Sequence, residues 1–299
     1  MVAGSILSAR AIAPMRQLFA AWGQLQQARE SFGKLAEVMS AAPETSVGGV
    51  SASPVFKGRM TLEAVSFRYG SDRPAVLDRV DLEIAPGTMF GIVGPPGSGK
   101  STLIKLLLGL EAPESGRVLI DGQDLKHISP ILYRGQIGVV PQEIQLFSGT
   151  IAENIAMASS ERSFSRIVAA AKFVGLHDVV QGLPESYETM LGERGTGLSM
   201  GQRQLVALAR AIVRNPRILV LDEATSALDS ATEQELLANL RRAGSGRTII
   251  LVTHRVQVLQ SCDRAALLEQ GRVVRVGSAS EVLQATHRAV PREGLQAVP

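Results

Sequence analysis

The segment that most constrains the fold is a glycine-rich loop, GPPGSGKST, at residues 94–102. It follows an apolar run that ends at Val93 and precedes a helix predicted over residues 103–110. The glycines let the backbone turn its N–H groups toward phosphate oxygens, and the start of the next helix adds a favourable dipole. A strand, this loop and a helix, in that order, predict a phosphate-binding loop. A dinucleotide-binding loop is excluded because Thr102 stands where its third glycine belongs.

Two side chains of this loop bring chemistry of their own. We expect Lys100 to reach the β- and γ-phosphates of a nucleotide and the Ser101 hydroxyl to hold Mg²⁺. The residues predicted to bind the nucleotide here are Gly94, Pro95, Pro96, Gly97, Ser98, Gly99, Lys100, Ser101 and Thr102.

The surrounding sequence alternates between strand and helix patterns. Apolar bursts at residues 90–93, 136–140, 218–221 and 248–252 predict buried parallel strands, with helices between them. A two-residue alternation over 60–69 predicts a partly exposed strand. Together these patterns predict an α/β domain around a central parallel sheet.

The ends of the chain differ from this domain, which we place at residues 58–287. Residues 1–41 are predicted to be helical, with Pro14 interpreted as a first-turn proline and one apolar face that packs either on its own domain or on partner helices that this chain lacks. Residues 42–57 are predicted to be a linker and residues 288–299 a tail. The apolar face comprises Met15, Leu18, Phe19, Trp22, Leu25, Ala28, Phe32, Leu35 and Met39.

Composition narrows the class of protein. The 31 basic residues nearly balance 28 acidic ones, which disfavours a general nucleic-acid binder. Cys262 is the only cysteine, so no intramolecular disulfide or cysteine metal cluster is expected, and a reducing compartment is indicated. No apolar run approaches the roughly 20 residues that span a bilayer, and the first residues lack the basic start of a signal peptide. We expect a soluble piece and not a complete membrane protein.

A second chemical feature lies at the end of the strand predicted over 218–221. Asp222 is well placed to hold Mg²⁺, directly or through water, and Glu223 can polarise an attacking water. Two carboxylates at a strand end are by themselves common on protein surfaces. The phosphate loop upstream favours the functional interpretation.

Four further segments follow the phosphate loop: Gln142 after Val-Val-Pro, the sequence LSMGQ at 198–202, SALD at 226–229, and His254 after the last predicted strand. An amphipathic helix is predicted over residues 203–213, directly after LSMGQ. In order and spacing the whole set resembles the nucleotide-binding domain of an ATP-binding cassette (ABC) transporter, over about residues 58–287. The resemblance implies a P-loop fold with a mostly parallel central sheet, an antiparallel β subdomain and a helical subdomain that carries the signature LSMGQ.

The resemblance also implies a role for each matching residue. Tyr69 would stack on adenine, Gln142 would contact Mg²⁺ or water, Glu223 would act as general base, and His254 would hold the γ-phosphate. Catalysis of Mg²⁺-dependent ATP hydrolysis would then involve Lys100, Gln142, Glu223 and His254. Ser101, Gln142 and Asp222 would be the metal ligands.

The remaining matches imply a dimer. Ser199, Gly201 and Gln202 match the signature, which in this family closes over ATP bound to the opposite subunit, and Asp229 matches a loop that also crosses the interface. One copy would therefore hold two half-sites, and a second nucleotide-binding domain, in a homodimer, would complete them.

Two features resemble exporters in particular. Gly192-Glu193-Arg194-Gly195 resembles the exporter X-loop, and the N-terminal helix resembles the cytosolic extension of the last membrane helix in bacterial type I secretion exporters. We expect the C-terminal piece of a half-transporter that works with transmembrane domains at the cytoplasmic face of the bacterial inner membrane and exports protein or peptide. A lipid or drug exporter is the alternative.

Met200 departs from the family pattern, which usually has glycine there. Its bulk predicts slower hydrolysis or weaker closure, and it keeps open a catalytically impaired regulatory cassette, against which the intact Lys100, Asp222, Glu223 and His254 argue. A DNA-repair ATPase would carry a long coiled coil between phosphate loop and signature, and no heptads occur there. A soluble translation factor would carry two cassettes in one chain. No nucleic-acid partner is expected.

Overall fold

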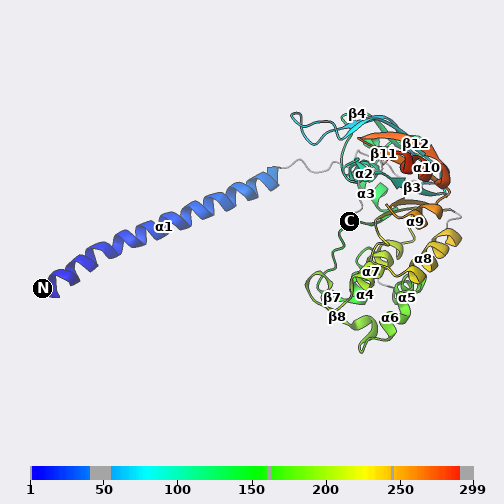
Figure 1. The fold of residues 1–299 in the computed structure, drawn as a ribbon. Coiled ribbons are helices and arrows are strands. Elements are labelled where there is room, and N and C mark those ends of the chain that lie inside the picture. Colours follow the sequence, from blue (N-terminus) through cyan, green and yellow to red (C-terminus); the bar gives the residue numbers. More distant parts are fainter. Residues whose placement is uncertain (1, 41–54, 160–162, 244–245, 290–299) are drawn as a thin grey trace, which may run out of the picture. The chain divides into compact units, whose positions relative to one another are not determined.

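The computed structural model describes residues 2–40, 55–159, 163–243 and 246–289, and the chain divides into two compact units. The first unit is dominated by one long helix, α1 (Val2–Ser40), and the second is an α/β domain (Figure 1). Pro14 lies inside α1, so its interpretation as a first-turn proline is wrong. A proline inside a helix loses one backbone hydrogen bond at a cost of about 3 kcal/mol, which the long run of good helix formers on both sides offsets.

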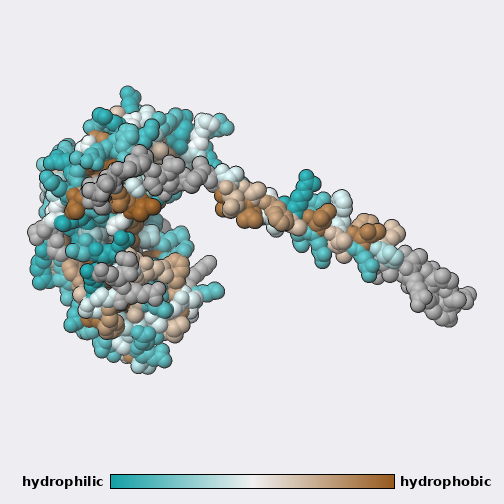
Figure 2. All heavy atoms as spheres, turned by 180° about the vertical axis from the view of Figure 1, so that it is seen from behind, coloured by the Kyte–Doolittle hydropathy of each residue, from teal (hydrophilic) through white to brown (hydrophobic). Residues whose placement is uncertain are grey.

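The predicted apolar face of α1 is exposed, with Leu18, Phe32 and Met39 each at least 70% accessible. Apolar residues are spread along the helix in Figure 2. On α1, Leu18, Leu25, Phe32 and Met39 recur every seven residues. Because seven residues are slightly fewer than two turns of a straight α-helix, this apolar face winds slowly around the helix axis. None of the helices within the described ranges is both long and apolar enough to cross a bilayer.

The domain is built on a six-stranded sheet of order β12-β11-β3-β10-β9-β6. Its strands are β3 (Met89–Val93), β6 (Ile137–Val140), β9 (Ile218–Asp222), β10 (Thr248–Val252), β11 (Arg264–Glu269) and β12 (Arg272–Gly277). All neighbours are parallel except β11 and β12. The four predicted parallel strands are confirmed, and β3, β9 and β10 are buried as predicted, whereas the edge strand β6 is only half-buried. The β11–β12 hairpin was not predicted, because its turn places Gln270 at φ 48° beside Gly271, without the Asn-Gly or Asp-Gly pair that marks such turns.

A second, antiparallel sheet has the order β2-β1-β4-β5. Its strands are β1 (Met60–Phe67), β2 (Leu77–Ile84), β4 (Ser115–Ile120) and β5 (Gln123–Asp124). Apolar side chains of β1 and β2 join one core cluster with Phe90 and Ile92 of β3 and with α2 (Lys100–Leu107). The predicted antiparallel subdomain is thus confirmed, and its core lies directly behind the phosphate loop.

Phe56 corrects the predicted linker. It is buried, lies edge-on to Tyr133 at a centroid distance of 5.9 Å, and its N–H donates to Gln136 Oε1 at 3.0 Å. The domain therefore begins before Gly58, because an apolar ring that reaches the core is held by packing that composition does not reveal. Residues 41–54 of the predicted linker lie outside the described residues.

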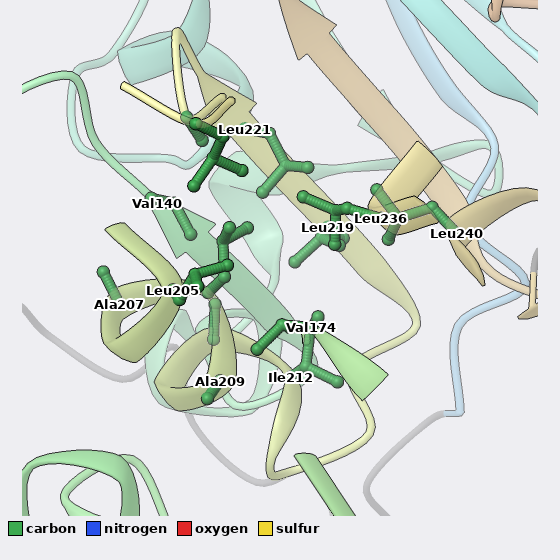
Figure 3. Packing of buried hydrophobic residues seen from close by; sticks show 14 of the residues in the cluster. Val140, Val174, Leu205, Ala207, Ala209, Ile212, Leu219, Leu221, Leu236 and Leu240 are labelled. Carbon is green, nitrogen blue, oxygen red and sulfur yellow. The ribbon is translucent and has the colours of Figure 1, made fainter. Parts of the chain in front are cut away.

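Helices form the rest of the domain. Figure 1 shows α4 (Ile151–Ala156), α5 (Phe164–Phe173), α6 (His177–Gln181) and α7 (Met200–Ile212) gathered together. Leu205 and Ile212 of α7 lie near Leu219 of β9 in Figure 3, in the second core cluster. The other elements are α3 (Pro130–Arg134), α8 (Ser230–Ala243), α9 (Val256–Gln260), α10 (Ala279–Ala289), β7 (Gly149–Thr150), β8 (Met190–Leu191) and the short helices η1 (Leu125–His127), η2 (Ser186–Glu188) and η3 (Glu193–Gly195).

Helix boundaries differ from the sequence predictions. Helix α2 begins at Lys100 and not at residue 103, because Gly99, at φ 103°, already forms its N-cap. The helix predicted over 203–213 begins at Met200, where Ser199 and Gln202 form a capping box. Helix α10 extends to Ala289, two residues past the predicted domain end, and residues 290–299 of the predicted tail lie outside the described ranges.

Candidate active site

The phosphate loop connects β3 to α2, and two of its glycines are required by close approach. A Cβ atom at Gly94 would lie 2.0 Å from the Leu268 carbonyl oxygen. At Gly99, where φ is 103°, a Cβ atom would lie 2.8 Å from Leu77 Cδ2. Gly97 meets no atom within 4 Å but has φ 77°, a conformation that costs other residues about 1–2 kcal/mol. The loop is therefore fixed by both packing and backbone conformation.

Inside this loop, Lys100 and Ser98 are the groups suited to an anion. Lys100 Nζ donates to the carbonyls of Gly94 at 2.8 Å and Pro95 at 2.9 Å. Burial lowers the pKa of Lys100, and the nearby Glu223 and Asp222 oppose that shift. The Ser98 hydroxyl is buried and has no hydrogen-bond partner in the described structure. A phosphate oxygen would satisfy such a donor, so the loop fits the nucleotide that its sequence predicts.

The acidic residues Asp222 and Glu223 lie at the end of β9, between β10 and the edge strand β6. Burial raises the pKa of the Asp222 carboxyl, the adjacent Glu223 adds to the rise, and Lys100 opposes it. Glu223 has φ 49°, and its N–H donates to the Val252 carbonyl at 3.0 Å. A left-handed conformation at a non-glycine residue costs of order 1–3 kcal/mol and persists only where its surroundings hold it. Such strain is typical of functional sites.

Three of the predicted catalytic side chains meet here. Gln142 Nε2 donates to Glu223 Oε2 at 3.1 Å, and His254 Nδ1 lies 3.2 Å from Glu223 Oε1. These residues follow β6, β9 and β10, whose carboxyl ends share one edge because the strands are parallel neighbours. The structure thus brings together residues up to 112 positions apart in sequence, all within reach of one carboxylate.

Tyr69 lies beside the start of α2. Its hydroxyl is 3.2 Å from Thr102 Oγ1 and accepts from Lys105 Nζ at 3.2 Å, and that ammonium lies 5.1 Å from the ring centroid. The ring is also edge-on to Phe67. Two predicted nucleotide-binding residues, Tyr69 and Thr102, are therefore in contact. Lys105 was not predicted, because a lysine one turn into a helix has no distinguishing sequence signal.

The signature residues form the start of α7. Ser199 Oγ accepts from the Gln202 N–H at 3.2 Å, and Gln202 Oε1 accepts from the Ser199 N–H at 2.9 Å. Gly201 lies against the loop after β9, since a Cβ atom there would be 2.9 Å from the Ala227 carbonyl oxygen. Met200 is 49% exposed, with its sulfur 3.5 Å from Arg203 Nη2. Ser199 and Gln202 thus bond within the first turn of α7, and Gly201 approaches Ala227.

Asp229 begins α8. Its carboxylate accepts from the N–H groups of Ala231 and Thr232 and from the Thr232 hydroxyl at 2.6 Å. The hydrogen bond from the Thr232 hydroxyl is the main cause that lowers the pKa of Asp229. In this chain alone, Asp229 is an N-cap residue.

Two buried polar arrangements beside the site were not predicted. Gln204 bridges α7 to the loop after β9, with Nε2 3.2 Å from the Glu223 carbonyl and Oε1 2.9 Å from the Ala227 nitrogen. Arg255, next to His254, forms an ion pair of 2.7 Å with Glu233, which is only 2% exposed. A polar residue on the buried face of α7 is the only sequence signal that points to Gln204.

Comparison with known proteins identifies the family. Residues 77–226, half of the chain, match the family model described as ABC transporter. The chain belongs to the ABC transporter family. The predicted resemblance and fold class are confirmed, and the second unit contains an ABC ATPase domain, which binds ATP.

The most similar relatives include transport proteins of bacteria. The leukotoxin translocation ATP-binding protein of Mannheimia haemolytica is 44% identical over 284 residues, which is 95% of this chain and 40% of that protein, and the protein of that name from Bibersteinia trehalosi matches equally. The structure of a bacterial Atm1-family ABC exporter with ATP bound is 36% identical, has a TM-score of 0.81, and is matched over 90% of this chain and 48% of its own. The chain thus spans less than half the length of these proteins.

Proposed function

We propose that this chain is the ATPase part of an ABC exporter and hydrolyses ATP with Mg²⁺. The observation that carries this proposal is the meeting of Gln142, Glu223 and His254 at the sheet edge that also carries the phosphate loop. Under this proposal, ATP is bound and hydrolysed at that edge of the six-stranded sheet.

In this proposal each residue has a defined role. The loop N–H groups and Lys100 hold the phosphates, and Glu223 accepts a proton from the attacking water. Gln142 orients that water through the carboxylate it already contacts, and His254 holds the γ-phosphate. Ser101, Asp222 and Gln142 would hold Mg²⁺, which would neutralise charge on the phosphates.

Asp222 is suited to the metal by its surroundings. Burial and the neighbouring Glu223 raise its pKa more than Lys100 lowers it, so its charged form is only partly compensated in the chain alone. A divalent cation supplies that compensation and favours the carboxylate.

A second copy of the chain completes the site. Ser199, Gly201, Gln202 and Asp229 would reach the nucleotide of the opposite copy in a homodimer. The exposed side chain of Met200 at the start of α7 supports a segment that faces outward. Residues 2–40, with their exposed apolar side chains, would join transmembrane domains at the cytoplasmic face of the bacterial inner membrane.

The proposed cargo is a protein or peptide exported in the manner of type I secretion. Support comes from the leukotoxin translocation protein, whose similarity extends over 95% of this chain, including the segment before the ABC domain. A lipid or drug exporter is the alternative, because the likeness to an Atm1-family ABC exporter supports an exporter without specifying its cargo.

The test is ATP hydrolysis measured against chain concentration, with Glu223→Gln in parallel. We expect specific activity that needs Mg²⁺, rises with concentration, and falls at least a hundredfold in the variant while ATP still binds. Hydrolysis that persists undiminished in Glu223→Gln would contradict the assignment of the general base.

A further inference from the structure

Gln204 lies between the signature and the catalytic carboxylate without belonging to either. It is the fifth residue of α7 and is 2% exposed. Its amide is bonded at both ends, with Nε2 donating to the Glu223 carbonyl at 3.2 Å and Oε1 accepting from the Ala227 N–H at 2.9 Å. A buried amide that satisfies two backbone groups fixes their separation, because losing either bond leaves a buried polar group unpaired.

Gln204 bonds to the backbone of Glu223, which has a strained, left-handed conformation. Glu223 has φ 49°, and its N–H is fixed by the Val252 carbonyl at the end of β10. Its carbonyl accepts from two groups, Gln204 Nε2 and the Ser226 N–H at 3.2 Å. The direction of the Glu223 side chain, and hence of the carboxylate that contacts Gln142 and His254, depends on this conformation.

The start of α7 also contacts the loop after β9 at a second point. Gly201, three residues before Gln204, leaves no room for a side chain against the Ala227 carbonyl. The Ala227 N–H thus donates to Gln204, and the Ala227 carbonyl packs closely against Gly201. The start of α7 is therefore joined to the segment from Glu223 to Ala227 by both hydrogen bonding and close packing.

We propose that Gln204 is a positioning residue that couples the signature end of α7 to the backbone of Glu223. A displacement of α7, of the kind that contact with a second copy would cause, reaches the general base through this side chain. The proposal rests on the proposed ATPase function, and it adds a residue that acts through Glu223 and does not touch the nucleotide.

The decisive variant is Gln204→Met, which keeps the volume and removes both hydrogen bonds. We expect kcat for ATP to fall about ten- to a hundredfold with KM changed less than threefold, because a misdirected base slows the chemical step and leaves nucleotide binding intact. Gln234→Met, on the exposed face of α8, is the matched control and should keep the kcat of the unmodified chain.

A double-mutant comparison separates positioning from general destabilisation. In the Glu223→Gln background, Gln204→Met should lower the residual rate less than twofold, since no base remains to be aligned. An equal loss in both backgrounds would overturn the proposal, as would a kcat within twofold of the unmodified chain. If Gln204→Met does not fold, Gln204→Glu, which keeps the acceptor for the Ala227 N–H and loses the donor to Glu223, is used in the same comparison.

Hydrogen exchange tests the coupling without any hydrolysis. Gln204→Met should speed amide exchange at Ala227 and Ser226 about tenfold and leave the amides of β3 unchanged. Unchanged exchange at Ala227 would overturn the proposal even in an active enzyme. If the unmodified chain hydrolyses no ATP but the exchange result holds, the proposed function fails and the coupling stands.

Discussion

The sheet edge and the start of α7 carry the two sets of residues that the family signature implies, and they differ in how complete they are. At the sheet edge, Gln142 and His254 already contact the Glu223 carboxylate. At the start of α7, Ser199 and Gln202 bond to each other and Ser199 accepts from the Arg203 N–H of the same helix, and Met200 is half exposed. One set is brought together by the parallel sheet and the other lies at an exposed helix start, which is the arrangement expected under our proposal that two copies share the site.

Removing the base at the sheet edge should have the largest effect. Glu223→Gln keeps the shape and the hydrogen bond from Gln142 but cannot accept a proton. We expect ATP hydrolysis to fall about 10²- to 10⁴-fold, as measured by phosphate release. Retained ATP affinity in an equilibrium binding experiment is the control for folding.

The ion pair that anchors the segment after His254 should dominate stability. Glu233 is buried, whereas its partner Arg255 is partly exposed and also donates to the Thr225 carbonyl, so Glu233→Ala should cost about 1.5–3 kcal/mol in the free energy of unfolding by urea. The exposed pair of Arg59 and Glu83 is the matched control, and Glu83→Ala should cost less than about 1 kcal/mol. Equal losses of unfolding free energy in the two variants would show that the pair of Glu233 and Arg255 stabilises the fold no more than the exposed pair does.

Alanine at Gly201 tests the contact between the two regions. The added Cβ atom would lie 2.9 Å from the Ala227 carbonyl, so α7 or the loop must shift. We expect hydrolysis to fall about tenfold with a modest loss of stability of about 1–3 kcal/mol. Unaltered steady-state rates in Gly201→Ala would show that this contact does not transmit displacement.

The contribution of Asp222 to folding stability changes with pH in the opposite direction to that of a typical paired carboxylate. Its folded-state pKa is raised, so the folded chain holds this proton more tightly than the unfolded chain, and stability falls as pH rises from the ordinary value of 3.8 through the raised one. Without Mg²⁺, Asp222→Asn should therefore raise the melting temperature at pH 7 by about 2 °C and flatten its dependence on pH. A lower melting temperature for Asp222→Asn at pH 7 would contradict this account.

Glycine at Met200 should have the smallest effect. Met200→Gly removes an exposed side chain beside the signature and is expected to speed hydrolysis about two- to fivefold, equivalent to less than about 1 kcal/mol in the barrier. Hydrolysis no faster than in the unmodified chain would show that Met200 does not slow the enzyme.

What could be predicted from sequence depends on how local the signal is. The phosphate loop and the strands β3, β6, β9 and β10 are marked by consecutive residues, and the parallel order of those strands then gathers Gln142, Glu223 and His254. The apolar periodicity predicts a helix start at residue 203, whereas the capping box of Ser199 and Gln202, a local signal, begins α7 three residues earlier at Met200. Gln204 could not be assigned, because its role depends on the strained backbone of Glu223 and on Ala227, which only the folded structure brings to it.

The most direct test of the central claim is complementation between two inactive chains. Lys100→Ala removes the phosphate-binding lysine and Ser199→Phe blocks the signature, so each variant alone should hydrolyse almost no ATP. Mixed in equal amounts, they form some dimers in which one interface has Lys100 from one chain and Ser199 from the other. The account predicts that activity returns, to roughly a quarter of that of the unmodified chain if pairing is random and each interface works alone. If both variants still dimerise but their mixture hydrolyses ATP no faster than either variant alone, the result would contradict a site shared between two copies.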